Sequence, residues 1–180
     1  MDFLTHLFLP LTVAYAVRPD LFRSPLYFAL GGFGLLADLD KFLLAPGYGH
    51  SLLTLGPICV AIVGVEYVVR EKLRIAPLIV ALILSHLVLD FVDGGPVPLL
   101  YPFVEQGVGL QYPARTVFGS GPLGLVDIEG PLATLRQTAP APGNRTYGFV
   151  QGAGVASLLA FVAVFVGRYQ SSDDHARTNE

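Results

Sequence analysis

The sequence predicts an all-α fold, a polytopic transmembrane helical bundle with about five spans. Apolar residues make up 53% of the 180 residues, charged residues only 14%, and the mean hydropathy is +0.59. Soluble domains carry about 25% charged residues, so this chain has too few polar side chains to cover a water-exposed surface. The charges also occur in short clusters between long apolar runs, as expected for membrane spans joined by loops.

Five apolar segments are the candidate spans. A bilayer core about 30 Å thick needs roughly 20 apolar residues in a helix. Three segments satisfy this well, whereas the first is short for a full crossing and the second carries three charged residues near its end. We do not expect the first to be a cleaved signal peptide, because no Lys or Arg precedes it. In chain order the segments are residues 3–17, 25–44, 51–69, 75–92 and 148–167.

The basic residues predict the orientation of the bundle. In a five-span arrangement, Arg18, Arg23, the link 70–74 and the tail residues Arg168 and Arg177 all fall on one side. Loops rich in Lys and Arg remain in the cytoplasm. We therefore expect a multi-pass protein of the cell (plasma) membrane, with the N-terminus outside and the C-terminus cytoplasmic.

The predicted organisation is a single membrane domain, residues 1–170, followed by a polar disordered tail, residues 171–180. Residues 93–151 are rich in Gly and Pro and form the predicted external loop. The net charge is −3 and no basic block occurs, so nucleic acid is not an expected partner. The single cysteine, Cys59, excludes an internal disulfide framework.

Six His and Asp side chains lie in or beside the apolar segments, at the predicted outer ends of four spans. A charged carboxylate at the centre of a membrane helix costs about 2.5–3.5 kcal/mol, so these groups must lie near an interface, line a polar cavity or be neutralised by a cation. Imidazole and carboxylate together suit Zn²⁺ best here, with Mn²⁺ and Fe²⁺ as alternatives. The candidate metal ligands are His6, Asp38, Asp40, His50, His86 and Asp90.

The spacing within two pairs adds to this prediction. His86 and Asp90 are four residues apart, so both project from one helix face. They could be two ligands, a ligand with its orienting carboxylate, or a structural hydrogen bond between spans. Asp38 and Asp40 are two residues apart, which puts them on different faces of a straight helix. Both can reach one centre only if that helix ends or is distorted.

Five short motifs occur in an order that resembles the YdjM-like membrane-bound metal-dependent hydrolases. The resemblance covers roughly residues 1–103 and implies a metal site and a hydrolytic activity. The chain departs from the family pattern at Ala37, which replaces Pro, at Lys41, which replaces His, and at Gly47-Tyr48-Gly49, where His-Arg-Gly is common. The motifs are Thr5-His6-Leu7-Phe8, Leu36-Ala37-Asp38-Leu39-Asp40, Gly49-His50-Ser51, Ser85-His86-Leu87-Val88-Leu89-Asp90 and the Pro-rich stretch 95–102.

The residues indicate an outward-facing metal site in a protein embedded in the lipid bilayer, and the resemblance implies that this membrane protein is a hydrolase. A site at the interface suggests a lipid or lipid-linked ester or phosphoester as substrate. Asp40 or Asp90 would accept a proton if it is not itself a ligand. Two alternatives remain open. The departures favour a catalytically degenerate membrane scaffold. A small ion- or proton-binding transporter would instead need polar residues across the whole bilayer.

Overall fold

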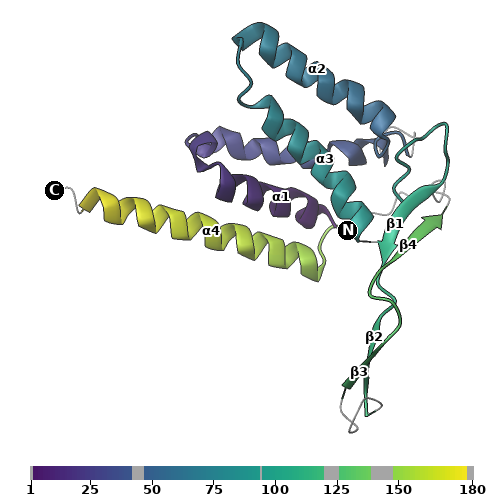
Figure 1. The fold of residues 1–180 in the computed structure, drawn as a ribbon. Coiled ribbons are helices and arrows are strands. Elements are labelled where there is room, and N and C mark those ends of the chain that lie inside the picture. Colours follow the sequence, from purple (N-terminus) through teal and green to yellow (C-terminus); the bar gives the residue numbers. More distant parts are fainter. Residues whose placement is uncertain (1, 42–46, 94, 120–125, 139–147, 178–180) are drawn as a thin grey trace.

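The computed structural model describes residues 2–41, 47–93, 95–119, 126–138 and 148–177 (Figure 1). Helices account for every predicted span, although residues 42–44 of the second span lie outside the described residues. The α-helices are α1 (Phe3–Val17), α2 (Leu52–Arg70), α3 (Ala76–Val92) and α4 (Gly152–Arg177), and the 3₁₀-helices are η1 (Pro19–Phe22) and η2 (Pro25–Lys41).

Two of these helices are long and apolar enough to cross a membrane, namely Leu52–Arg70 and the Gly152–Gln170 part of α4. The apolar helices α1 and α3 are shorter, with 15 and 17 residues. The predicted count of five spans therefore stays a prediction. α4 also continues to Arg177, into the segment 171–180 for which we predicted a polar tail.

The second predicted span is a 3₁₀-helix over its described length, because small buried residues recur every three positions. Gly31, Gly34, Ala37 and Asp40 are all buried in η2, and three residues is the 3₁₀ period. A Cβ atom on Gly34 would lie 2.7 Å from the backbone oxygen of His6. The two glycines and the alanine of this stripe let η2 lie directly against α1 and α3.

The helices α2 and α3 form a hairpin whose turn is fixed by Glu66. Its carboxylate accepts backbone hydrogen bonds from Arg74, Ile75 and Ala76 at 2.6 to 3.1 Å. The first N–H groups of a helix have no partner within that helix. Since residue 75 offers no capping side chain, a carboxylate from the preceding helix takes this role.

The all-α prediction is wrong for part of the predicted external loop. It forms two nested antiparallel pairs: β1 (Gly107–Gln111) with β4 (Thr134–Thr138), and β2 (Arg115–Phe118) with β3 (Val126–Glu129). The resulting ribbon projects away from the helices (Figure 1). Short Val-, Thr- and Ile-containing runs between the Gly and Pro residues favour strands, and Gly130 adopts a positive φ of 89° between β3 and β4.

One apolar cluster holds α2, α3 and η2 together. Ile83 and Leu87 of α3 lie in it, on either side of His86 in the sequence. On the other side of the bundle, α1 runs beside α4 (Figure 1). Packing on both sides therefore fixes the helices that carry the predicted polar residues. The buried members of the cluster are Ala37, Leu55, Cys59, Ile83, Leu87 and Val97.

Candidate metal centre

All six predicted polar residues converge at one end of the bundle. His6 comes from the first turn of α1, and His50 precedes α2 by two residues. His86 and Asp90 come from α3, and the two remaining carboxylates come from the end of η2. The imidazoles of His6 and His86 are each only 1% exposed, so water does not solvate them freely.

Four atoms of this group form a compact cluster: Nε2 of His50, Nε2 of His86, Oδ1 of Asp38 and Oδ2 of Asp90. The two nitrogens are 3.3 Å apart, and each lies 3.3 Å from the Asp90 oxygen. The Asp38 oxygen lies 3.6 Å from the His50 nitrogen and 3.5 Å from the His86 nitrogen. Five of the six distances among these atoms are therefore nearly equal.

These distances form two triangles that share the His50–His86 edge, and each triangle has the spacing of three ligands around one tetrahedral cation. Ligand atoms about 2.0–2.1 Å from a tetrahedral centre lie about 3.3–3.4 Å from one another. The two nitrogens also cannot both carry protons, because two N–H groups would then point at each other across 3.3 Å. At least one of the two presents a lone pair to the centre, as a metal ligand does.

Each of the three imidazoles is oriented by an oxygen at its Nδ1 atom. An Nδ1–H that donates to oxygen leaves Nε2 as the nitrogen that can bind a metal, which is the usual arrangement around metal-ligating histidines. All three Nε2 atoms face the carboxylates of the cluster. The Nδ1 contacts are His6 with the Asp2 backbone oxygen at 3.0 Å, His50 with Asp40 Oδ2 at 3.1 Å, and His86 with the Gly34 backbone oxygen at 2.7 Å.

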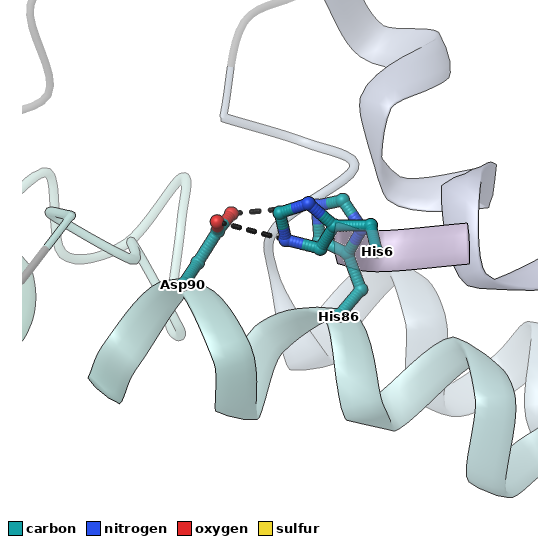
Figure 2. Close-up of side chains that lie close together, drawn as sticks. All are labelled: His6, His86 and Asp90. Atoms are coloured by element: carbon teal, nitrogen blue, oxygen red, sulfur yellow. Dashed lines mark ion pairs between the residues drawn. The ribbon is translucent and has the colours of Figure 1, made fainter. Parts of the chain in front are cut away.

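His6 stands beside the four-atom cluster rather than within it. Its Nε2 atom lies 3.0 Å from Oδ1 of Asp90, and its ring stacks on His86 with centroids 4.0 Å apart (Figure 2). Asp90 therefore bridges His6 through one oxygen and the other two imidazoles through the second. The set His6, His86 and Asp90 also has ligand atoms within 4.8 Å of one another, and so do Asp38, His50 and His86.

Asp40 orients a histidine instead of facing the centre. Its Oδ2 atom accepts backbone hydrogen bonds from Gly47 at 2.9 Å and Gly49 at 3.1 Å, in addition to the contact with His50. A Cβ atom on Gly49 would overlap the Ala37 carbonyl oxygen. The Gly-Tyr-Gly segment, where the chain departs from the family pattern, thus forms the cradle that holds this carboxylate.

Lys41 brings a positive charge to the edge of the cluster. Its ammonium group donates to Oδ1 of Asp38, the oxygen that faces His50 and His86, and its side chain is 25% exposed. Burial lowers the pKa of His50, but the hydrogen bonds to Asp40 and Asp90 outweigh it, so the pKa lies above its ordinary value. Protonation of His50 therefore competes with metal binding more strongly than it does at an ordinary histidine.

Three residues that support the site were not predicted. Asp2 is fully buried and caps α1 by accepting from the Thr5 backbone, and the Asp-x-x-Thr spacing could have indicated this. Gly34 contributes a backbone carbonyl, for which the sequence carries no signal. Ser51 donates to the Tyr101 backbone oxygen at 2.7 Å and so ties the Pro-rich stretch to the start of α2.

Fold and site together define a helical membrane protein with a cluster of three His and three Asp residues at one end, all buried except the partly exposed Asp90. A family model described as YdjM inner membrane protein matches residues 1–171. The chain therefore belongs to the YdjM inner membrane protein family, which confirms the resemblance noted in the motifs and supports an inner-membrane location. Searches of curated proteins and of solved structures found no match.

Proposed function

We propose that this protein is a membrane-embedded metal-dependent hydrolase. Its cation would be held by His50, His86, Asp38 and Asp90. The single observation that carries this proposal is the spacing of the two imidazole nitrogens, which lie 3.3 Å from each other and 3.3 to 3.6 Å from one oxygen of Asp38 and one of Asp90. Two nitrogens and two oxygens suit Zn²⁺ best, and Mn²⁺ and Fe²⁺ accept the same donors.

When bound, such a cation supplies Lewis acidity, which polarises a carbonyl or phosphoryl oxygen and makes water a better nucleophile at neutral pH. The protein's own groups hold and move the proton. Asp90 contacts the cluster through Oδ2 and His6 through Oδ1, so a proton released at the centre can be held at Nε2 of His6. Asp40 would orient the His50 ring.

The substrate class follows from the position and charge of the site. The cluster lies at one end of an apolar bundle, where the bonds between lipid chains and headgroups are within reach. Lys41 adds a partly exposed ammonium group beside Asp38, and a phosphate group would be attracted to it. We therefore propose a lipid or lipid-linked ester or phosphoester as substrate.

The proposed orientation places this end of the bundle outside the cytoplasm. The end opposite the cluster carries Arg18, Arg23, Arg70 and Arg74, and basic residues remain in the cytoplasm.

Cysteine labelling tests this orientation. In a Cys59→Ala background, a cysteine placed at Thr116 of β2 should react with a membrane-impermeant maleimide in intact cells. A cysteine at Lys72 should react only after lysis. The reverse pattern would contradict the orientation.

Elemental analysis of the purified protein tests the hydrolase proposal. Prepared without chelators, the wild-type protein should retain a stoichiometric transition metal, and His50→Ala combined with His86→Ala should remove it. The matched control is His175→Ala, which changes a histidine of the polar tail. Metal-dependent cleavage should then be sought with fluorogenic lipid esters and phosphoesters. Equal metal content in wild type and the double variant would refute the site.

A catalytically degenerate scaffold is the second candidate, and Lys41 is the observation that favours it. An ammonium group on Asp38 already offsets one buried negative charge, as a metal ion would. In that case the purified protein should contain no metal, and Lys41→Met should destabilise it by removing a positive charge that offsets the buried Asp38 carboxylate. The transporter alternative gains no support, because the described buried carboxylates gather at one end of the bundle.

A further inference from the structure

A second feature of the bundle is a groove between α1 and α3 that shares no residue with the polar cluster. Its volume is about 820 Å³, and its walls include Val13 of α1 and Ala81 and Leu89 of α3. Among the described residues that line it, only Arg18, Arg74 and Ser85 are polar. The groove is therefore an apolar channel with two arginines.

The groove is open along its length. Val13, Val17 and Val88 line it and remain 56%, 69% and 59% exposed. Within a bilayer the medium beside such a surface is lipid, and a groove lined by aliphatic side chains excludes water. An extended acyl chain matches both the composition of the walls and the elongated shape set by two neighbouring helices.

Charge is confined to one end of the groove. Arg18 follows the last residue of α1, and Arg74 precedes the first residue of α3 by two positions. Two acidic groups lie beside them. Asp20 accepts from Arg18 at 3.1 and 3.2 Å, and this contact holds the pKa of the Asp20 carboxyl below its ordinary value. Glu66 accepts from the Arg74 backbone N–H at 3.1 Å. Over this whole end of the bundle, the basic residues outnumber the acidic ones, so the net charge there is positive: Arg18, Arg23, Arg70, Lys72 and Arg74 stand against Asp20, Glu66 and Glu71.

From this combination we infer that the groove binds an anionic phospholipid, with the headgroup phosphate at Arg18 and Arg74 and an acyl chain between α1 and α3. Basic pockets between membrane helices recognise anionic headgroups, and arginine suits phosphate because its guanidinium donates two parallel hydrogen bonds. The phosphate competes with Asp20 for Arg18. The Arg74 guanidinium makes no hydrogen bond or ion pair with a side chain of the described residues and acts on Asp20 through its charge.

Photolabelling in vesicles tests this site. The protein is reconstituted in phosphatidylcholine with a minor fraction of phosphatidylglycerol that carries a diazirine on one acyl chain. After irradiation, mass spectrometry should locate the label on α1 and α3, at groove residues such as Val13 and Ala81. Unlabelled phosphatidylglycerol should compete for this labelling, and unlabelled phosphatidylcholine should not.

Two charge variants should change the photolabelling of the groove in opposite directions. Arg74→Gln should lower groove labelling about fivefold, and Asp20→Asn should raise it by freeing Arg18. The matched control is Arg70→Gln, because Arg70 lies at the same end of the bundle but outside the groove, 3.9 Å from Glu66. Labelling in that variant should equal the wild-type level.

Two phenylalanine substitutions test whether an acyl chain occupies the groove. Ala81→Phe fills the groove and should abolish the labelling, whereas Ala61→Phe, on an exposed position of α2, should leave it unchanged. Uniform labelling of all helices, equal competition by phosphatidylcholine, or equal effects of Arg74→Gln and Arg70→Gln would each overturn the inference. So would a cross-link between two copies through the groove. Metal content should be the same in all these variants, so this inference and the hydrolase proposal fail separately.

Discussion

Replacing Asp90 with Asn removes one negative charge from the centre while keeping the size of the side chain. The amide oxygen can still accept a hydrogen bond from an imidazole. If Asp90 only paired with His86, the variant would therefore keep both its fold and any bound metal. The structure predicts a larger effect, because Asp90 contacts three imidazoles through two oxygens, at 3.0 Å to His6 and at 3.3 Å to His50 and His86.

The magnitude follows from these contacts. Loss of a residue that only orients a ligand weakens metal binding about 10- to 100-fold, and loss of a direct ligand costs more. With Oδ2 as a ligand and Oδ1 on His6, Asp90→Asn should weaken metal binding more than 100-fold, or more than about 2.7 kcal/mol. Asp40→Asn should fall within the 10- to 100-fold range, because Asp40 orients His50.

The assay is a competition between the protein and a chelator of known affinity, followed by elemental analysis. Metal at about 100 times its dissociation constant should add about 2.7 kcal/mol to the free energy of unfolding of the wild type, and this gain should disappear in Asp90→Asn. The control is Asp127→Asn, an exposed change in β3. Unchanged metal affinity in Asp90→Asn would reduce the His86–Asp90 pair to an ordinary helix contact and would refute this metal centre.

Three further outcomes are expected. Gly34→Ala should lower the free energy of unfolding by about 1–3 kcal/mol in a denaturation assay, because the added Cβ would lie 2.7 Å from a backbone oxygen. Gly32→Ala, which adds a Cβ in open space, should change that free energy by no more than about 0.5 kcal/mol. Lys41→Met should raise metal affinity about fivefold to tenfold, since it removes a competing cation from Asp38; a lower affinity would contradict this. Because the pKa of His50 is raised, metal affinity should fall about tenfold per pH unit below that pKa, and pH-independent titrations would exclude His50 as a ligand.

The polar cluster could be predicted from the sequence because the energetic argument is local. A His or Asp in an apolar run is costly wherever it lies, so residues such as His86 and Asp90 must share a polar environment. The helix boundaries were predictable for a similar reason: apolar runs end where charges begin, as α2 does at Arg70. The helix boundaries need only one segment at a time, and the convergence of the polar residues needs in addition only the order of the spans.

The nested ribbon and the acceptors behind the imidazoles could not be predicted in this way. Strand pairing joins residues far apart in the sequence, such as Gly107 and Thr138, and one Gly- and Pro-rich stretch is compatible with many pairings. The Nδ1 acceptors of His6 and His86 are backbone carbonyls, a group that every residue carries. Only the path of the chain decides which carbonyl meets which ring.

The 3₁₀ form of η2 resolves the spacing problem posed by Asp38 and Asp40. In an α-helix, residues two apart lie on different faces, and one of the two carboxylates would be expected to turn away. Here both reach the same imidazole from opposite sides: Asp40 contacts Nδ1 of His50 at 3.1 Å and Asp38 lies 3.6 Å from its Nε2. The pair therefore divides two roles, one carboxylate orienting the ring and the other facing the centre. The same period of three places Lys41 above Asp38, so the helix that assembles the site also brings the cation that competes with a metal for it.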